Sequence, residues 1–337
     1  MIINMDLGKN SYDIVVERGC LSRADELINL NRKVLVITDE GVPKEYSGCI
    51  ASKCKEAVVE CVAQGEVSKG FDTYKRLLSV LLKHNFTRTD CVVAVGGGVV
   101  GDLSGFVAAS FMRGIDFYNI PTTLLSQIDS SIGGKVAINL DGIKNIVGAF
   151  YQPKKVLIDP DVLKTLPQRQ VSSGLAEAIK MSLTSDEELF ELFEKEDVYK
   201  NIDTIIVKSL MIKKDVVEQD EKEQGLRKIL NFGHTIGHGI ESVESKNGLY
   251  HGECVALGMI PMCSEDVRQR LLTVLKKVNL PYKLNYDATR VCEAMSHDKK
   301  FDGNKVTVIF VNEPGTFEMK KLGFDEMTDI TKKAFEV

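Results

Sequence analysis

The sequence lacks several features that would assign it to a broad class at once. Its 337 residues contain no run of about 18 apolar residues and no apolar signal-peptide core, so we expect a cytoplasmic protein. Positive charge is not in excess, because 43 Lys and Arg stand against 48 Asp and Glu, which disfavours a general nucleic-acid binder. The eight cysteines include no Cys-x-x-Cys pair, so a disulfide framework is not expected.

Length and periodicity predict two domains. At 337 residues the chain exceeds one ordinary domain of about 100–200 residues. Short β-branched runs at 33–38, 57–61 and 91–95 alternate with helical stretches such as 71–84. This alternation predicts an α/β domain with a parallel, Rossmann-like sheet over residues 1–152. Long helical stretches then predict a mainly helical domain over residues 153–337, with a hairpin near its end.

A glycine-rich turn follows the third β-branched run. Gly96, Gly98 and Gly101 fit G-x-G-x-x-G at the start of a helix. Backbone N–H groups at such a helix start favour a pyrophosphate. The alternative is a glycine-rich turn that only allows close packing. The motif does not establish an orthodox Rossmann dehydrogenase, because it does not follow the first strand of the sheet.

A polar stretch follows the glycine-rich turn. Thr122 and Thr123 are expected to open a helix, where hydroxyl groups cap N–H groups or contact phosphate and ribose. Residues 130–145, which include Lys135 and Lys144, form an unusually polar and flexible stretch that suits an anionic substrate. Solvated loop lysines are the alternative.

Three of the only five histidines are candidate metal ligands. His234 and His238 are one helical turn apart, and His251 begins the following helix, so two or three imidazoles can converge. A catalytic zinc takes three protein ligands, and Glu177 is a candidate carboxylate for the third. The absence of Glu after His234 excludes the H-E-x-x-H protease motif. An ordinary helical histidine pair is the alternative.

Together these motifs resemble the 3-dehydroquinate synthase family over about residues 39–300. The resemblance is carried by Gly96–Asp102, Arg113-Gly114, Pro121–Lys135, Lys144-Asn145, Gly174–Lys180, Asp220–His238, His251-Gly-Glu253 and Asp298-Lys-Lys300. It implies an amino-terminal α/β domain that binds NAD and a helical domain that binds a metal and the substrate.

The resemblance also implies site residues. The metal, expected to be zinc with cobalt also possible, would bind Glu177, His234 and His251. NAD would contact Asp39, Glu66, Lys69, Gly98, Val99, Val100, Gly101, Asp102, Thr122, Thr123, Asp129, Lys135, Lys144, Val162, Leu163, Lys164 and Thr165. The substrate and catalytic groups would be Arg113, Lys135, Asn145, Lys180, Lys213, Glu223, Arg227, Asn231, His238, Lys299 and Lys300. Arg113 resembles an arginine that reaches the neighbouring subunit's site, which implies a homodimer.

The implied activity is a lyase step of the shikimate pathway, in aromatic amino acid biosynthesis. It converts 3-deoxy-D-arabino-heptulosonate 7-phosphate into 3-dehydroquinate and phosphate. NAD takes a hydride, phosphate is eliminated, the hydride returns, and an intramolecular aldol step closes the ring. Glu223 and His238 would relay protons. The alternatives are another sugar-phosphate cyclase and a zinc polyol dehydrogenase of the glycerol dehydrogenase type, whose neutral substrate would not need Lys135 and Arg227.

Overall fold

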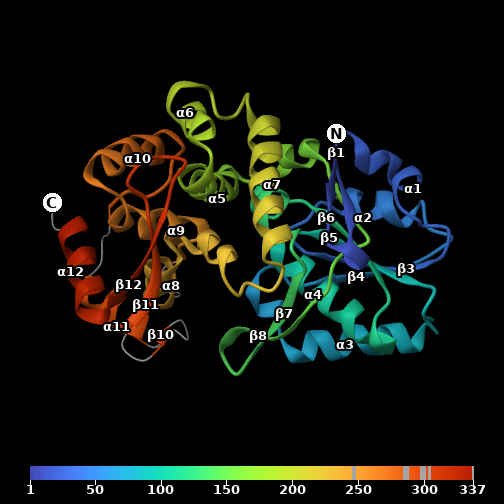
Figure 1. The fold of residues 1–337 in the computed structure, drawn as a ribbon. Helices are drawn as coiled ribbons and strands as arrows, with labels where there is room; N and C mark the ends of the chain where they lie inside the picture. Colours follow the sequence, from blue (N-terminus) through green and yellow to red (C-terminus); the bar gives the residue numbers. More distant parts are fainter. Residues whose placement is uncertain (245–247, 284–287, 297–300, 303–304, 336–337) are drawn as a thin grey trace. The chain divides into compact units, whose positions relative to one another are not determined.

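The computed structural model describes residues 1–337 except 245–247, 284–287, 297–300, 303–304 and 336–337. It divides into two compact units, Met1–Leu166 and Pro167–Val337 (Figure 1). The sequence predicts a boundary after residue 152, whereas the structure divides the chain after Leu166. The reason is a strand, β9 (Lys155–Ile158), which pairs in parallel with two strands of the first unit's sheet.

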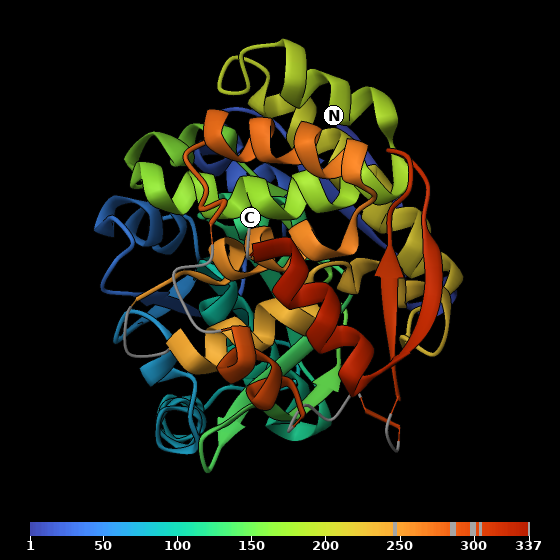
Figure 2. The ribbon, with the colours of Figure 1, turned by 90° about the vertical axis from the view of Figure 1, so that its left-hand side faces the viewer.

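The second unit is mainly helical, as predicted (Figure 2). Its helices are α5 (Gln168–Ser185), α6 (Glu187–Lys195), α7 (Ile202–Gln219), α8 (His234–Glu244), α9 (His251–Met259), α10 (Glu265–Lys277), α11 (Ala288–Ser296) and α12 (Phe324–Phe335). A three-stranded antiparallel sheet contains β10 (Phe301–Asp302), β11 (Lys305–Phe310) and β12 (Glu318–Gly323), and β11 with β12 is the predicted hairpin. Helix α5 is buried along almost its whole length, so it forms the centre of this unit. None of the described helices is both long and apolar enough to span a bilayer.

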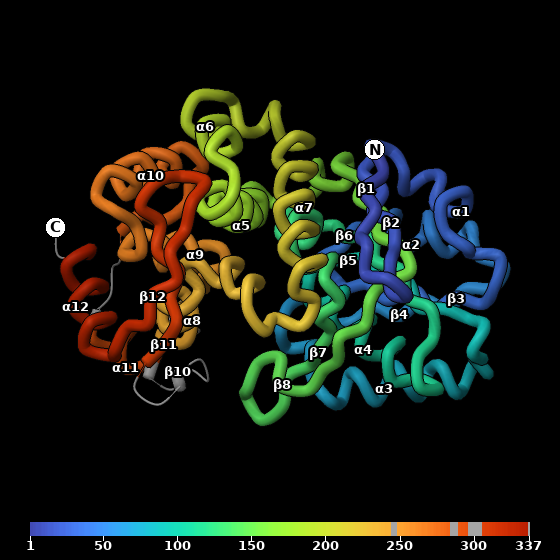
Figure 3. Tube along the Cα trace, viewed as in Figure 1, coloured from blue at the N-terminus to red at the C-terminus, as the bar shows by residue number. Residues whose placement is uncertain are grey.

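The first unit contains a seven-stranded sheet in the order β1-β2-β9-β6-β5-β3-β4. Its other strands are β1 (Ile2–Met5), β2 (Tyr12–Val16), β3 (Lys33–Asp39), β4 (Glu56–Val62), β5 (Cys91–Gly96) and β6 (Asp116–Pro121). Strands β1 to β6 can be located by their labels in Figure 3. Only β1 pairs antiparallel; every other pair is parallel. The predicted strands are β3, β4 and β5, and the predicted α/β fold is confirmed.

Helices cover both faces of this sheet, which explains why its central strands are apolar on both sides. Val34 and Val36 of β3 pack with Ile50 of α2 (Lys44–Ala51), in the same cluster as residues around α1 (Ala24–Leu27). Leu35 and Ile37 point to the other face, where they pack with α3 (Phe71–Lys83) and α4 (Gly98–Ser110). The helix predicted at 71–84 is α3, which buries Leu77 and Leu81.

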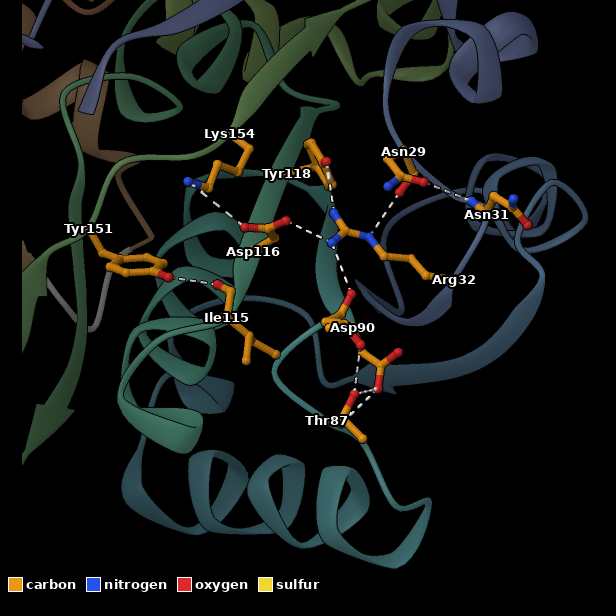
Figure 4. Close-up of polar contacts among 11 residues, drawn as sticks. Asn29, Asn31, Arg32, Thr87, Asp90, Ile115, Asp116, Tyr118, Tyr151 and Lys154 are labelled. Carbon is orange, nitrogen blue, oxygen red and sulfur yellow. Dashed lines mark hydrogen bonds and ion pairs between the residues drawn. The ribbon is translucent and has the colours of Figure 1, made fainter. Parts of the chain in front are cut away.

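The amino ends of three neighbouring strands are joined by Arg32 (Figure 4). This side chain precedes β3 and donates to the Thr89 carbonyl before β5 at 3.1 Å. It also donates to Asp116 at 2.7 Å and to the Tyr118 hydroxyl at 2.8 Å, both in β6. The partly buried guanidinium therefore stabilises the edge of the sheet where these strands begin.

A two-stranded hairpin occupies the stretch that the sequence suggests is polar and flexible. Strands β7 (Lys135–Leu140) and β8 (Ile143–Phe150) pair antiparallel through the two-residue turn Asp141-Gly142. Both turn residues have positive φ, as an Asp-Gly hairpin turn requires. Strand β7 buries alternate residues, Val136 and Ile138, whereas β8 is largely exposed. The apolar residues of β8 therefore do not alternate between core and solvent as in a half-buried strand.

Candidate functional site

The predicted NAD residues of the first unit gather at the carboxyl ends of its parallel strands. They are Asp39 at the end of β3, Glu66 and Lys69 after β4, Gly98–Asp102 after β5, Thr122 and Thr123 after β6, and Val162–Thr165 after β9. Neighbouring parallel strands present these ends at one edge. The chain runs from β3 to β4 on one side and then crosses back past β3 to β5 on the other. The topological switch point, where open sheets bind ligands, therefore lies between β3 and β5, beside the glycine turn.

Helix α4 begins at Gly98, directly after β5. Its first N–H groups therefore open onto the same edge and can donate to an anionic group. Thr123 precedes a helical turn, as predicted, with residues 124 and 125 helical. Its hydroxyl accepts a hydrogen bond from Ser126 N at 3.2 Å, and the turn continues as the π-helical segment Ser126–Ser130, which contains Asp129.

Lys69 joins predicted cofactor residues to a predicted substrate residue. Its side chain is only 3% exposed and donates to the Asp102 carboxylate, and to Asn145 Oδ1 at 2.6 Å. Asn139, which the sequence analysis missed, donates from Nδ2 to Glu66 at 2.8 Å. Glu66, Lys69 and Asn139 line a cavity of about 350 Å³. Lys135 and Lys144 lie on the same hairpin as Asn145 with exposed side chains.

Arg113 is not brought to this edge. It ends the short helix η4 (Phe111–Arg113), which follows α4 and precedes the amino end of β6. Because α4 runs back from the carboxyl edge, Arg113 lies toward the opposite edge of the sheet. Met112, Arg113 and Gly114 all have positive φ, and the Arg113 side chain is exposed. Such strained backbone is concentrated at functional sites.

In the second unit, Glu177, His234 and His251 meet as a candidate metal centre. Glu177 in α5 is fully buried, and its Oε1 atom lies 3.8 Å from His234 Nε2 and 3.4 Å from His251 Nε2. Ligand atoms of all three lie within 4.8 Å of one another. Glu177 Oε1 makes no hydrogen bond within the described part of the chain. A buried carboxylate oxygen facing two imidazole nitrogens fits a divalent metal ion.

Two glycines in α9 allow its backbone to approach α5 and the start of α8. A Cβ atom at Gly252 would lie 1.9 Å from the Ser173 carbonyl oxygen in α5. A Cβ atom at Gly258 would lie 2.0 Å from the carbonyl oxygen of Gly233, the residue before His234. These contacts set the distances between the three ligand-bearing helices.

The amino end of α9 is also anchored by Glu253. Its carboxylate accepts a hydrogen bond from Tyr250 N at 2.7 Å, which caps the helix that begins at His251. Arg169 in α5 binds both oxygens of Glu253, each at 2.7 Å. The first residue of α9 is therefore held against the helix that bears Glu177.

Both imidazoles are oriented through Nδ1. His234 Nδ1 lies 3.1 Å from the Phe232 carbonyl oxygen, and His251 Nδ1 lies 3.4 Å from Glu241 Oε2. With Nδ1 carrying the proton, each ring presents Nε2 to Glu177, which is the arrangement of metal-binding histidines. Glu241 was missed in the sequence analysis, although it follows His234 and His238 along one face of α8 at helical spacing.

The electrostatics of this centre are strongly coupled. Burial opposes ionisation of Glu177, but Lys180 and the two rings hold the pKa of this carboxyl well below its usual value. Burial, reinforced by Lys180, lowers the pKa of His234. Although burial also disfavours the charged form of His251, the neighbouring Glu177 and Glu241 carboxylates raise its pKa to about 9.

His238 belongs to a second cluster. Its ring centroid lies 5.5 Å from that of His234 and 6.1 Å from that of His251. His238, Glu241 and His251 also have ligand atoms within 4.8 Å of one another. His251 is thus common to both clusters, but only the first contains a fully buried carboxylate.

Three predicted substrate residues are buried cations. Lys180 is 1% exposed, Lys213 in α7 is 5% exposed and Arg227 in η7 (Leu226–Asn231) is 2% exposed. Lys180 pairs with Glu177, and Arg227 donates to the Glu221 carbonyl at 2.5 Å. Ammonium and guanidinium groups form strong, charge-assisted hydrogen bonds with phosphate and carboxylate groups. The arrangement therefore suits an anionic ligand.

Glu223 and Asn231 are also brought together. Asn231 Nδ2 donates to Glu223 Oε1 at 3.0 Å, and Glu223 has a positive φ of 59°. Asn145 in the first unit likewise has a positive φ of 54°. Predicted site residues thus take strained conformations in both units. Lys299 and Lys300 lie outside the described residues.

Comparison with known proteins gives the family. The model for the amino-terminal domain of 3-dehydroquinate synthase matches residues 59–173, and the model for its carboxy-terminal domain matches residues 174–301. The chain belongs to the 3-dehydroquinate synthase family. A 3-dehydroquinate synthase of Enterococcus faecalis is 40% identical to it over 97% of both chains.

Solved structures share the fold. A 2-deoxy-scyllo-inosose synthase complexed with carbaglucose-6-phosphate, NAD+ and Co2+ has a TM-score of 0.88 at 24% identity, over 99% of this chain and 100% of that one. The 2-epi-5-epi-valiolone synthase of Streptomyces hygroscopicus, with NAD+ and Zn2+ bound, has a TM-score of 0.87 at 25% identity, over 98% of both chains. The predicted two-part architecture is thereby confirmed.

Proposed function

We propose that this chain is a cytoplasmic 3-dehydroquinate synthase that converts 3-deoxy-D-arabino-heptulosonate 7-phosphate into 3-dehydroquinate and phosphate. The observation that carries the proposal is the Glu177–His234–His251 cluster, with an unsatisfied carboxylate oxygen and two oriented imidazoles, in a chain of this family. The reaction needs a metal and a hydride acceptor. The second unit contains residues suited to the metal, and the first contains residues suited to NAD.

Glu177, His234 and His251 would hold the metal. Two nitrogens and one carboxylate oxygen leave coordination positions open for substrate oxygens, and both zinc and cobalt accept such a set. We propose zinc as the resident ion. When bound, the metal acts as a Lewis acid on substrate hydroxyl groups, while bound NAD accepts and returns a hydride.

The chain's own residues bind and orient the reactants. The N–H groups at the start of α4 would donate to the NAD pyrophosphate, with Asp39, Lys69, Asp102 and the other predicted NAD residues around it. The buried cations Lys180, Lys213 and Arg227 would neutralise the phosphate and carboxylate of the substrate, a role that a neutral polyol would not require. His238 and Glu223 would hold and move protons, with Asn231 orienting Glu223 at 3.0 Å.

Arg113 would act in trans within a homodimer. Its exposed side chain and left-handed backbone at the amino-end side of the sheet, away from the cofactor residues of its own unit, support a role at a neighbouring subunit's site. The dimer and the contribution of Arg113 are both part of the proposal.

The test is a turnover measurement with the metal-loaded protein. Catalytic NAD and the heptulosonate phosphate are supplied, phosphate release is followed, and a dehydratase converts any dehydroquinate into an ultraviolet-absorbing product. We expect phosphate and dehydroquinate in equal amounts without net NADH. Glucose 6-phosphate is the control for another cyclase, and glycerol is the control for a dehydrogenase. Turnover of glucose 6-phosphate alone, or steady NADH from glycerol, would contradict the proposal.

Glu241 is expected to tune the metal site through His251. Replacing Glu241 with alanine removes the acceptor for His251 Nδ1, so metal affinity should fall about 10- to 100-fold. The affinity is measured by competition with a chromophoric chelator. Glu241→Gln keeps an acceptor oxygen and should recover part of the loss. Glu191→Ala, at an exposed glutamate in α6, is the control and should bind metal like the parent protein.

A further inference from the structure

We infer that Asn139 is a positioning residue that holds the cofactor cavity in shape by joining the segment after β4 to the β7–β8 hairpin. The inference rests on the proposed binding of NAD in the first unit. Asn139 lines the 350 Å³ cavity together with Glu66 and Lys69, but it was not among the predicted site residues.

Each polar group of Asn139, apart from its own carbonyl, contacts a different residue of the candidate site. Its backbone N–H donates to the Lys69 carbonyl at 2.7 Å. Its side-chain Nδ2 donates to Glu66 Oε2 at 2.8 Å, and its Oδ1 accepts from the backbone N–H of Asn145 at 2.9 Å. One side chain thus connects two segments more than 65 residues apart in sequence.

A local irregularity of the hairpin makes these contacts possible. Between the pairs Ile138–Val147 and Leu140–Ile143, β7 has only Asn139, whereas β8 has the longer stretch 144–146, so Asn139 faces a bulge in β8. The hydrogen-bond ladder is locally disrupted at a bulge, so the Asn139 N–H group can donate to a third segment, at the Lys69 carbonyl oxygen. Asn145, within this stretch of β8, has φ of 54°, so β8 departs from regular strand geometry opposite Asn139.

These contacts control Lys69 from two directions. The Lys69 ammonium lies between the Asp102 carboxylate at the start of α4 and Asn145 Oδ1, while the Lys69 carbonyl accepts from Asn139. Asn139 also holds the backbone of Asn145. In addition, it occupies one oxygen of Glu66 and leaves the other to accept a hydrogen bond from a ligand hydroxyl group. Asn139 therefore sets the relative positions of Glu66, Lys69 and Asn145.

The first measurement is NADH affinity, by titration of the fluorescence of the reduced nicotinamide ring. Asn139→Ala removes two side-chain hydrogen bonds and should weaken NADH binding about tenfold or more. Asn4→Ala is the matched control, because Asn4 also donates to a carboxylate, Asp13 at 3.0 Å, on the edge strand β1. It should leave the affinity unchanged. Thermal melts of both variants establish that they fold.

Exchanging the donor and the acceptor of the Asn139–Glu66 hydrogen bond tests whether this bond itself, rather than the general stability of the fold, controls NADH binding. Asn139→Asp keeps an acceptor for Asn145 N–H but sets a carboxylate against Glu66, so it should bind NADH more weakly than the parent protein. Combining Asn139→Asp with Glu66→Gln restores a donor and an acceptor in reversed order, so we expect the double variant to bind more tightly than Asn139→Asp alone.

The outcomes are distinguishable. If the parent protein does not bind NADH, the proposed function fails. If the parent binds NADH and a folded Asn139→Ala variant binds it equally well, the positioning role is wrong. If Asn139→Asp weakens NADH binding and the added Glu66→Gln does not recover any of the lost affinity, the inference is also wrong.

Discussion

Replacing Gly252 with alanine is expected to abolish productive metal binding although no ligand is changed. The new Cβ atom would lie 1.9 Å from the Ser173 carbonyl oxygen, where an ordinary contact needs about 3.4 Å, so α9 must shift by about 1.5 Å. His251, the residue before Gly252, must move with it and away from Glu177. We expect turnover to fall at least about 100-fold, as for other misplacements of about 1 Å. The free energy of unfolding should also fall by about 3 kcal/mol.

A glycine with open space around it provides the control. Gly48 lies in helix α2 with nothing within 4 Å of its added Cβ, so Gly48→Ala should leave turnover unchanged. Metal affinity is measured by chelator competition and folding by circular dichroism. A folded Gly252→Ala variant that binds metal as tightly as the parent would show that the close approach of α5 and α9 does not set the site.

The fold was predictable where its signal is local. Strands β3, β4 and β5 and helix α3 were found because β-branched runs and helical spacing of Leu77 and Leu81 reveal them without knowledge of their partners. Strand β8 could not be found in this way, since it is largely exposed and exists through its pairing with β7. The domain boundary was placed too early for a related reason. Strand β9 belongs to the first unit through pairing with β2 and β6.

The site was predictable in composition but not in geometry. Helical spacing brings His234 and His238 together and cannot decide which of them faces a carboxylate. That decision depends on where α5 and α9 cross, which is set by backbone contacts at Gly252 and Gly258 between residues distant in sequence. The role of Asn139 could not be predicted from the sequence, because it follows from a register shift between the two strands of a hairpin. Glu241 could have been found from its spacing to His238.

Changing Glu177 to glutamine should have the largest effect of any single ligand substitution. Structural zinc sites with four ligands are worth about 10–16 kcal/mol, so one ligand contributes about 3–4 kcal/mol, or roughly several hundredfold in affinity. Turnover at a fixed, subsaturating metal concentration should fall to a similar extent. Glu241→Gln is the comparison, because it alters a carboxylate next to His251 while keeping an acceptor oxygen. If Glu241→Gln proved the more damaging, the metal would belong to the cluster of His238, Glu241 and His251.

The same substitution also removes the carboxylate beside Lys180, which is itself almost fully buried. Breaking a buried ion pair from one side costs about 3–5 kcal/mol, so Glu177→Gln should lower the melting temperature as well as metal affinity. Adding Lys180→Met replaces the pair by neutral groups and should restore much of the stability. It cannot restore metal binding, because the ligand oxygen remains an amide. Recovery of stability without recovery of metal affinity would therefore separate the two roles of Glu177, whereas recovery of both would exclude it as a ligand.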